Sequence, residues 1–225
     1  MTFSIAARCP RTGRFGVAVT SSSPAVAARC AHVRPGVGAV CSQNVTDPRL
    51  GTRLLDLLES GVPAKTAVRE VAAQPHAEWR QLTAVGASGL GAVFSGARTL
   101  GTYAEAVGPD AVAAGNLLSG LGVPQAVLDA FTAADPQVPL ARRLVDALTA
   151  GAAAGGEAGP VHSAGLLVVD AQRWPVTDLR VDWTEGDPIA ELADLWKRWE
   201  PQQEAYVQRA LAPDAAPNYG VPGDE

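Results

Sequence analysis

Lysine is almost missing from this chain. Lys65 and Lys197 are the only two lysines, and arginine carries the remaining side-chain positive charge. Few lysines are therefore available as catalytic groups. The net charge of −5 and the scattered arginines leave no basic footprint, which argues against a nucleic-acid partner. No apolar run approaches the roughly 18 residues that suggest a membrane span, so no membrane partner is expected. No basic segment followed by an apolar one begins the chain, so no secretory signal is predicted.

Metal-ligating residues are few and lack the spacing of a metal site. The three cysteines are Cys9, Cys30 and Cys41. The three histidines are His32, His76 and His162. An odd number of cysteines without metal-type spacing favours reduced thiols in a cytoplasmic protein. The Gly/Ala stretch 151–159 has no phosphate-loop lysine and does not follow a strand, so it is not a nucleotide cradle. We therefore predict neither a metal nor a cofactor.

The length and composition predict one globular domain. A chain of 225 residues with 47% hydrophobic and 18% charged residues is long and apolar enough to bury its own core. We assign residues 1–211 to this domain. Residues 212–225 combine prolines, glycines and acidic residues, a composition that predicts a disordered tail.

Hydrophobic periodicity alternates between strand-like and helix-like groups. Strands are predicted at 2–7, 15–21, 36–43, 81–85, 91–95, 103–107, 111–114, 164–169 and 176–181. Helices are predicted at 47–61, 64–73, 125–133, 140–150 and 189–211, the last with a possible break at Pro201. Residues 24–32 suit either a short helix or an irregular loop. Groups of strands that alternate with groups of helices favour antiparallel sheets with helices outside. This order predicts an α+β protein, and a four-layer αββα sandwich fits it.

Thr2 opens the first predicted strand and carries the chemistry of most interest. A small second residue usually permits removal of Met1, which would make Thr2 the mature amino terminus. Its hydroxyl is then a nucleophile, and its own α-amine, with a pKa of about 7.7–8.0, is the base. The alternative is that Thr2 merely begins an edge strand, which many chains that start Met-Thr would share.

An ordered set of segments resembles a known family. The set contains Thr2 to Arg8, Gly16 to Val19, Arg34 to Val40, Asp47 to Gly51, Gly115 to Leu118 and His162 to Val169. Together, over about residues 2–195, they resemble the domain of unknown function 1028, which is assigned to the N-terminal-nucleophile hydrolase superfamily. The resemblance implies an αββα fold and, by superfamily analogy, hydrolysis of an amide bond. It does not supply a substrate.

Residue by residue, the resemblance places the family's first strand at Thr2 and its Gly-Asn segment at Gly115-Asn116. Two segments depart from the family pattern. Where the family usually has Arg-Gly-Arg-Gln-Ser-Ala, this chain has Gly-Pro-Val-His-Ser-Ala at 159–164. Where it often has Ser-Lys or Ser-His, this chain has three serines at 21–23. Both departures remove polar or cationic groups near the expected pocket.

The candidate site combines these residues. Thr2 is the predicted nucleophile and Asn116 a predicted oxyanion donor, with a turn residue as the alternative for Asn116. The predicted substrate-binding residues are Ser21, Ser22, Ser23, Gln43, His162 and Ser163. The alternative for the serines is a solvated strand end, and the alternative for His162 is a capping or solvent-exposed position. Because three strand ends meet at one sheet edge, Asn116, the serines and His162-Ser163 are expected near Thr2.

The sequence therefore predicts a cytoplasmic N-terminal threonine amidohydrolase that acts on a small, non-peptide amide. The rival interpretation is a non-catalytic ligand-binding or assembly module with the same fold. Trp183, Trp196 and Trp199 are expected to cover a sheet edge or a subunit interface, and we expect a homo-oligomer.

Overall fold

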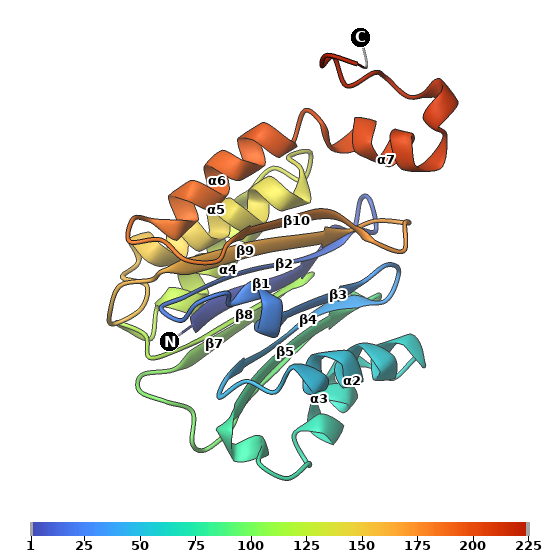
Figure 1. Ribbon diagram of the computed structural model, residues 1–225. Coiled ribbons are helices and arrows are strands. Elements are labelled where there is room, and N and C mark those ends of the chain that lie inside the picture. The colour runs from blue at the N-terminus through green and yellow to red at the C-terminus, as the bar shows by residue number, and fades with distance from the viewer. Residues whose placement is uncertain (1, 224–225) are drawn as a thin grey trace.

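The computed structural model describes residues 2–223 and contains two antiparallel sheets with helices on their outer faces (Figure 1). The strands are β1 (Thr2–Arg8), β2 (Phe15–Ser21), β3 (Ala31–Arg34), β4 (Gly38–Asn44), β5 (Arg80–Gly86), β6 (Gly91–Ser95), β7 (Ala104–Gly108), β8 (Ala111–Asn116), β9 (Ser163–Val169) and β10 (Pro175–Val181). The helices are α1 (Ala27–Cys30), α2 (Pro48–Glu59), α3 (Ala64–Val71), α4 (Val123–Ala133), α5 (Leu140–Ala153), α6 (Pro188–Trp199) and α7 (Gln203–Leu211), with 3-10 turns at Ala77–Trp79 and Pro213–Ala215.

The layers follow the order helix, sheet, sheet, helix. The larger sheet has the strand order β10-β9-β2-β1-β8-β7, and α4, α5 and α6 cover its outer face (Figure 1). The smaller sheet has the order β3-β4-β5-β6 and is covered by α2 and α3. The fold is thus the four-layer αββα sandwich that the sequence predicts.

Strand β1 lies in the middle of the larger sheet and is buried on both faces. Its odd-numbered residues Phe3 and Ile5 belong to the core between the sheet and helices α4 and α5. Its even-numbered Ala6 packs into the core between the two sheets. Because side chains alternate across a strand, Thr2 and Ser4 share the face of Ala6 and point toward the smaller sheet. The residue predicted as nucleophile therefore begins a central strand, not an edge strand.

Helix α2 shows how local sequence sets the element boundaries. The Asp47 carboxylate accepts a hydrogen bond from the Arg49 amide, and Pro48 occupies the first turn, where no amide hydrogen is needed. Leu54 and Leu57 lie on the buried face of the helix. Asp47 is thus the amino-terminal cap of α2.

Residues 24–32 do not form one element. Helix α1 contains only four residues, and strand β3 follows it directly and pairs with β4. The sequence analysis predicts no strand here, because Ala31–Arg34 contains His32 and Arg34 and has no run of β-branched residues. Pairing with β4 stabilises this short edge strand, so tertiary context overrides the local propensity.

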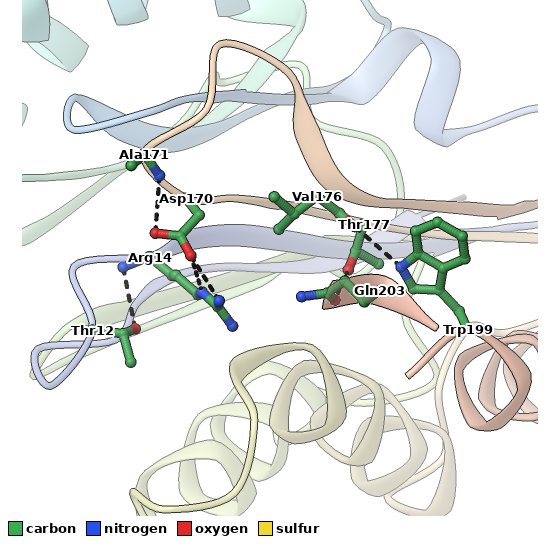
Figure 2. Close-up of polar contacts among 8 residues, drawn as sticks. All are labelled: Thr12, Arg14, Asp170, Ala171, Val176, Thr177, Trp199 and Gln203. Carbon is green, nitrogen blue, oxygen red and sulfur yellow. Dashed lines mark hydrogen bonds and ion pairs between the residues drawn. The ribbon is translucent and has the colours of Figure 1, made fainter. Parts of the chain in front are cut away.

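The carboxyl-terminal helices are joined to the larger sheet by polar contacts (Figure 2). The chain breaks between α6 and α7 around Pro201, as predicted. Trp199 Nε1 donates to the Val176 carbonyl at 3.1 Å, and Thr177 Oγ1 donates to Gln203 Oε1 at 2.8 Å, so both helices contact β10. Trp196 is a buried residue of α6 and Trp199 packs against the same core, so both tryptophans cover the larger sheet.

Residues after α7 contact that helix. Arg209 donates to the carbonyls of Pro217 and Asn218 and lies over the ring of Tyr219. Helix α7 itself has no buried residues. The assignment of residues 1–211 to one domain and 212–225 to a disordered tail stays a prediction, and residues 224–225 lie outside the described range, as does Met1.

Truncation after Leu211 is expected to change the melting temperature by no more than about 3 °C. The described residues that it removes are exposed or half-buried, and their loss therefore takes little apolar surface from the core. Differential scanning calorimetry of the full and shortened chains measures the change. A large fall in melting temperature, or loss of an assembled form, would show that the tail docks.

Candidate active site

A row of polar residues crosses four adjacent strands of the larger sheet at the amino end of β1. Thr2 is paired with Asn116 of β8 on one side, and the β1–β2 register places Ser21 opposite Thr2 on the other. Ser21 is in turn paired with Ser163 of β9. Directly opposed residues in antiparallel strands have Cβ atoms about 4.5–5.5 Å apart. Four residues that the sequence predicts as site residues therefore lie side by side.

The serines of this row form a chain of hydroxyl contacts that begins at Thr2. Thr2 Oγ1 donates to Ser21 Oγ at 3.3 Å, and Ser21 Oγ lies 2.9 Å from Ser23 Oγ. The Ser23 amide also donates to Ser21 Oγ, at 3.1 Å. Ser163 Oγ donates to the Ser23 carbonyl at 2.6 Å and so fixes the loop that follows β2. Only 5% of the Thr2 surface is exposed, so the hydroxyl lies in a largely dry environment.

A buried chain of side-chain amides connects the two sheets below this row. Ser4 Oγ donates to Gln43 Oε1 at 2.6 Å, and Gln43 Nε2 donates to Gln81 Oε1 at 2.8 Å. Gln81 Nε2 donates to Ser95 Oγ at 2.9 Å and to the Gly115 carbonyl at 3.1 Å. Gln43 and Gln81 are fully buried on the paired strands β4 and β5. Gln43, a predicted binding residue, is thus held at the sheet interface beneath Thr2.

Asn116 lies between this amide chain and Thr2. Its Nδ2 donates to Gln81 Oε1 at 3.2 Å, which leaves the second hydrogen of the same nitrogen for another acceptor. Its Oδ1 is buried and has no hydrogen-bond partner among the described residues. The next residue, Leu117, has a left-handed backbone with φ of 52°, a costly conformation for a leucine. Strain of this kind often marks functional sites, and here it ends β8 directly after Asn116.

His162 contributes its backbone to the site and its ring to a different contact. The His162 amide donates to the Ser21 carbonyl at 2.9 Å. Its Nδ1 lies 2.8 Å from the Thr184 carbonyl, which can only accept, so this nitrogen carries the hydrogen. The ring stacks on Trp183 with centroids 4.4 Å apart and an interplanar angle of 14°. His162 therefore borders the serine chain, and its role in substrate binding stays a prediction.

Glu157 is a site residue that sequence analysis misses. Only 7% of its surface is exposed, and neither carboxylate oxygen has a hydrogen-bond partner of good geometry among residues 2–223. Burial raises the pKa of this carboxyl to about 8, and the positive charge of the amino terminus, followed by the nearby amide and hydroxyl of Ser22, only partly offsets that effect. A lone acidic residue within a stretch of glycines and alanines is the signal that the sequence carries.

The Glu157 segment lies directly beyond the amino end of β1. Glu157 forms an isolated antiparallel bridge with Leu118, two residues past Asn116 on β8. On its other side lies Ser22, one residue past Ser21 on β2. Because β8 and β2 flank β1, Glu157 lies between the continuations of these two strands, just beyond Thr2, the first residue of β1. Gly155, with φ of 114°, lets the chain approach so closely that an added Cβ would meet Ser119 Oγ at 2.3 Å.

The raised pKa of Glu157 predicts a specific pH dependence of stability for the chain that carries Met1. A folded pKa of about 8 against an ordinary 4.5 favours the protonated carboxyl in the folded state. This contribution is complete below pH 4.5 and is lost as the pH rises through 8. Glu157→Gln stays neutral, so the wild type should lose stability relative to the variant across this window, by an amount on the order of a few kcal/mol. Urea unfolding at intervals of pH measures the difference, and parallel profiles would contradict the prediction.

Metal-ligating residues do not gather within the described part of the chain, where no three His, Cys, Asp or Glu residues form a cluster suited to a metal ion. No helix among residues 2–223 is both long and apolar enough to cross a membrane.

Comparison with known proteins identifies the family. The model of the family of unknown function DUF1028 matches residues 2–192, and the chain belongs to this family. The DUF1028 protein SPO2555 from Silicibacter pomeroyi is 30% identical, with 88% of each chain covered and a TM-score of 0.81. The family resemblance drawn from the sequence is thus confirmed.

More distant structures are the Anbu proteins. A Gly-1 mutant of Anbu from Hyphomicrobium sp. strain MC1 is 12% identical, covers 92% of this chain and all of its own, and has a TM-score of 0.41. Anbu from Yersinia bercovieri is 13% identical over 92% of this chain and 97% of its own, with a TM-score of 0.40. These scores are too low to support a conclusion about activity. No curated protein matches the sequence.

Proposed function

We propose that this protein, after removal of Met1, is an N-terminal threonine amidohydrolase that cleaves a small, non-peptide amide. The observation that supports this most is the polar row, in which Thr2 begins a central strand and meets Ser21 and Asn116 on its two flanking strands. The buried side chains of Ser21 and Asn116 adjoin Thr2, and hydrogen bonds extend this polar group from Asn116 to Gln81 and Gln43.

The proposed chemistry needs only groups of this chain, the substrate and water. The Thr2 hydroxyl attacks the amide carbon, and the Thr2 α-amine takes the hydroxyl proton. The C–N bond breaks, the leaving amine receives that proton, and an ester remains on Thr2. Water then attacks the ester, the acid leaves, and the Thr2 hydroxyl is restored. Asn116 is the proposed donor to the oxyanion that forms in each attack.

The alternative is a ligand-binding or assembly module without catalysis, and the burial of Thr2 favours it. A nucleophile that is only 5% exposed needs a path for the substrate, whereas a structural threonine does not. Assembly into a homo-oligomer and a cytoplasmic location stay predictions under both interpretations.

Intact-mass spectrometry followed by an amide panel tests the proposal. We expect the mass of the chain without Met1 and release of acid from at least one small amide. Retention of Met1 on an active protein would overturn the mechanism, because the α-amine of Thr2 would then be part of a peptide bond. A mature chain that binds an amide without cleaving it would support the binding module instead.

A further inference from the structure

Glu157 is a buried acidic residue that has no role in the proposed reaction as described above. Its carboxylate oxygens have no partner of good geometry within the described range, although the residue is more than nine-tenths buried. Burial of an ionised carboxylate without a partner is strongly unfavourable, so such a group normally faces a donor or a cation. The group that would complete this site is therefore a hydrogen-bond donor, and a cationic one suits it best.

The position of Glu157 indicates which donor this is. The carboxylate lies between Leu118 and Ser22, the residues that follow the two strands flanking β1. In a chain that begins at Thr2, the first nitrogen is the α-amine at the amino end of β1, and this end faces the place that Glu157 occupies. A neutral amine offers two N–H donors and an ammonium offers three.

We propose that Glu157 is a positioning residue that accepts a hydrogen bond from the α-amine of mature Thr2. This inference rests on the proposed function, because it requires Thr2 as the amino terminus. The carboxylate holds the amine so that its lone pair is directed at the Thr2 hydroxyl. It also stabilises the ammonium that forms when the amine takes the hydroxyl proton.

The proposal has a measurable consequence for the amine. A carboxylate within about 4–6 Å favours the ammonium form and raises the pKa of an amine by roughly 1–3 units. An ammonium held directly by the carboxylate lowers the pKa of Glu157 further, so the mature chain should lose less stability with rising pH than the chain that carries Met1. Two other titratable groups border the serine chain. Arg29 donates to Ser23 Oγ at 3.0 Å, and the His162 ring is stacked on Trp183.

The test uses full-length chains that begin at Thr2, released from a cleavable amino-terminal fusion. Acetic anhydride in limiting amount acetylates neutral amines, and mass spectrometry of the amino-terminal peptide at successive pH values gives the pKa of the Thr2 amine. Lys65 and Lys197 are the only other amines in the chain and serve as internal references. We expect a pKa above the ordinary value of about 7.7–8.0 for the wild type.

Three variants separate positioning from a general effect of charge. Glu157→Gln should lower the pKa of the amine by about one unit, a tenfold rise in the neutral fraction at pH 7. Glu157→Asp keeps the charge and should keep most of the shift. Glu185→Gln is the matched control, because this exposed carboxylate near His162 loses the same charge and should leave the amine unchanged. Circular dichroism and melting temperature confirm that each variant folds.

The outcomes distinguish this proposal from the proposed function. Coincident labelling curves for the wild type and Glu157→Gln, or an amine that stays unreactive in both, overturn the role of Glu157. If the protein hydrolyses an amide and Glu157→Gln leaves the acidic limb of the pH–rate profile unchanged, the role of Glu157 is also overturned. The proposed function then stands. If the pKa of the Thr2 amine differs between the wild type and Glu157→Gln but the protein cleaves no amide, the role of Glu157 is supported and the amidohydrolase function is rejected. A downward shift of the acidic limb by about one pH unit in Glu157→Gln supports both.

Discussion

Replacement of Thr2 by alanine in the mature chain is expected to reduce amide hydrolysis by at least about 10⁴-fold, because the hydroxyl that forms the acyl-enzyme is removed. Thr2→Ser should retain measurable turnover, since it keeps both the hydroxyl and the α-amine. The fold should survive, because the side chain contributes a hydrogen bond of 3.3 Å to Ser21, whose loss costs roughly 1 kcal/mol. Steady-state rates on the best amide of the panel measure the effect.

A substrate-independent measurement accompanies this comparison. The activated ester p-nitrophenyl acetate should acetylate the Thr2 hydroxyl and release p-nitrophenol. An ester on oxygen is cleaved by hydroxylamine, whereas an acetyl group on the α-amine is not, so peptide mass spectrometry before and after hydroxylamine separates the two. The hydroxylamine-sensitive adduct should be absent from Thr2→Ala. Equal rates of hydrolysis in the wild type and Thr2→Ala would show that Thr2 is not the nucleophile.

Asn116→Ala is expected to lower kcat by about 10²–10³-fold, the usual cost of one lost oxyanion donor. Asn116 is directly opposite Thr2 in the β1–β8 ladder, and one hydrogen of its Nδ2 is not used by Gln81. A donor that acts in the transition state should change kcat more than KM. The alternative, in which Asn116 only ends β8, predicts a change in stability with little change in kcat.

Ser95→Ala is the matched control for Asn116→Ala. Ser95 accepts a hydrogen bond from Gln81 Nε2, so both variants remove one partner of the same buried glutamine. Ser95 lies on β6 in the smaller sheet, however, whereas Asn116 is the strand partner of Thr2 in the larger sheet. Equal losses of kcat in the two variants would mean that the amide chain acts through stability and not through oxyanion contact.

Much of the fold can be predicted from sequence because its strands have strong local signals. β2 and β6 begin and end where alternation and turn residues place them, and the Gly86–Gly89 hairpin forms as expected. Strand β3 could not be predicted in this way, since its four residues gain their extended form from pairing with β4. The layer order was accessible because groups of strands and helices alternate along the chain.

The candidate site was only partly accessible from sequence. The row from Asn116 to Ser163 follows from strand topology, because each member ends or begins a strand. Gln81 and Glu157 escape prediction for different reasons. Gln81 is the first residue of the predicted strand 81–85 and resembles an ordinary polar boundary, although Gln43 pairs with it across β4 and β5. Glu157 belongs to a Gly/Ala stretch whose path across the end of β1 is set by the tertiary fold alone.

Under the proposed function, the amide chain between the sheets also limits the ways in which a substrate can reach Thr2. Gln43, Gln81 and Asn116 come from both sheets, and their hydrogen bonds hold only in one alignment. Sliding or separation of the two sheets would break all of these buried hydrogen bonds together. We therefore do not expect the sheets to separate to admit a substrate. Entry must instead depend on the three short segments around the end of β1, at 22–23, 117–119 and 155–158. Amide hydrogen exchange should therefore be fastest in these segments and slowest in β1, β4 and β5.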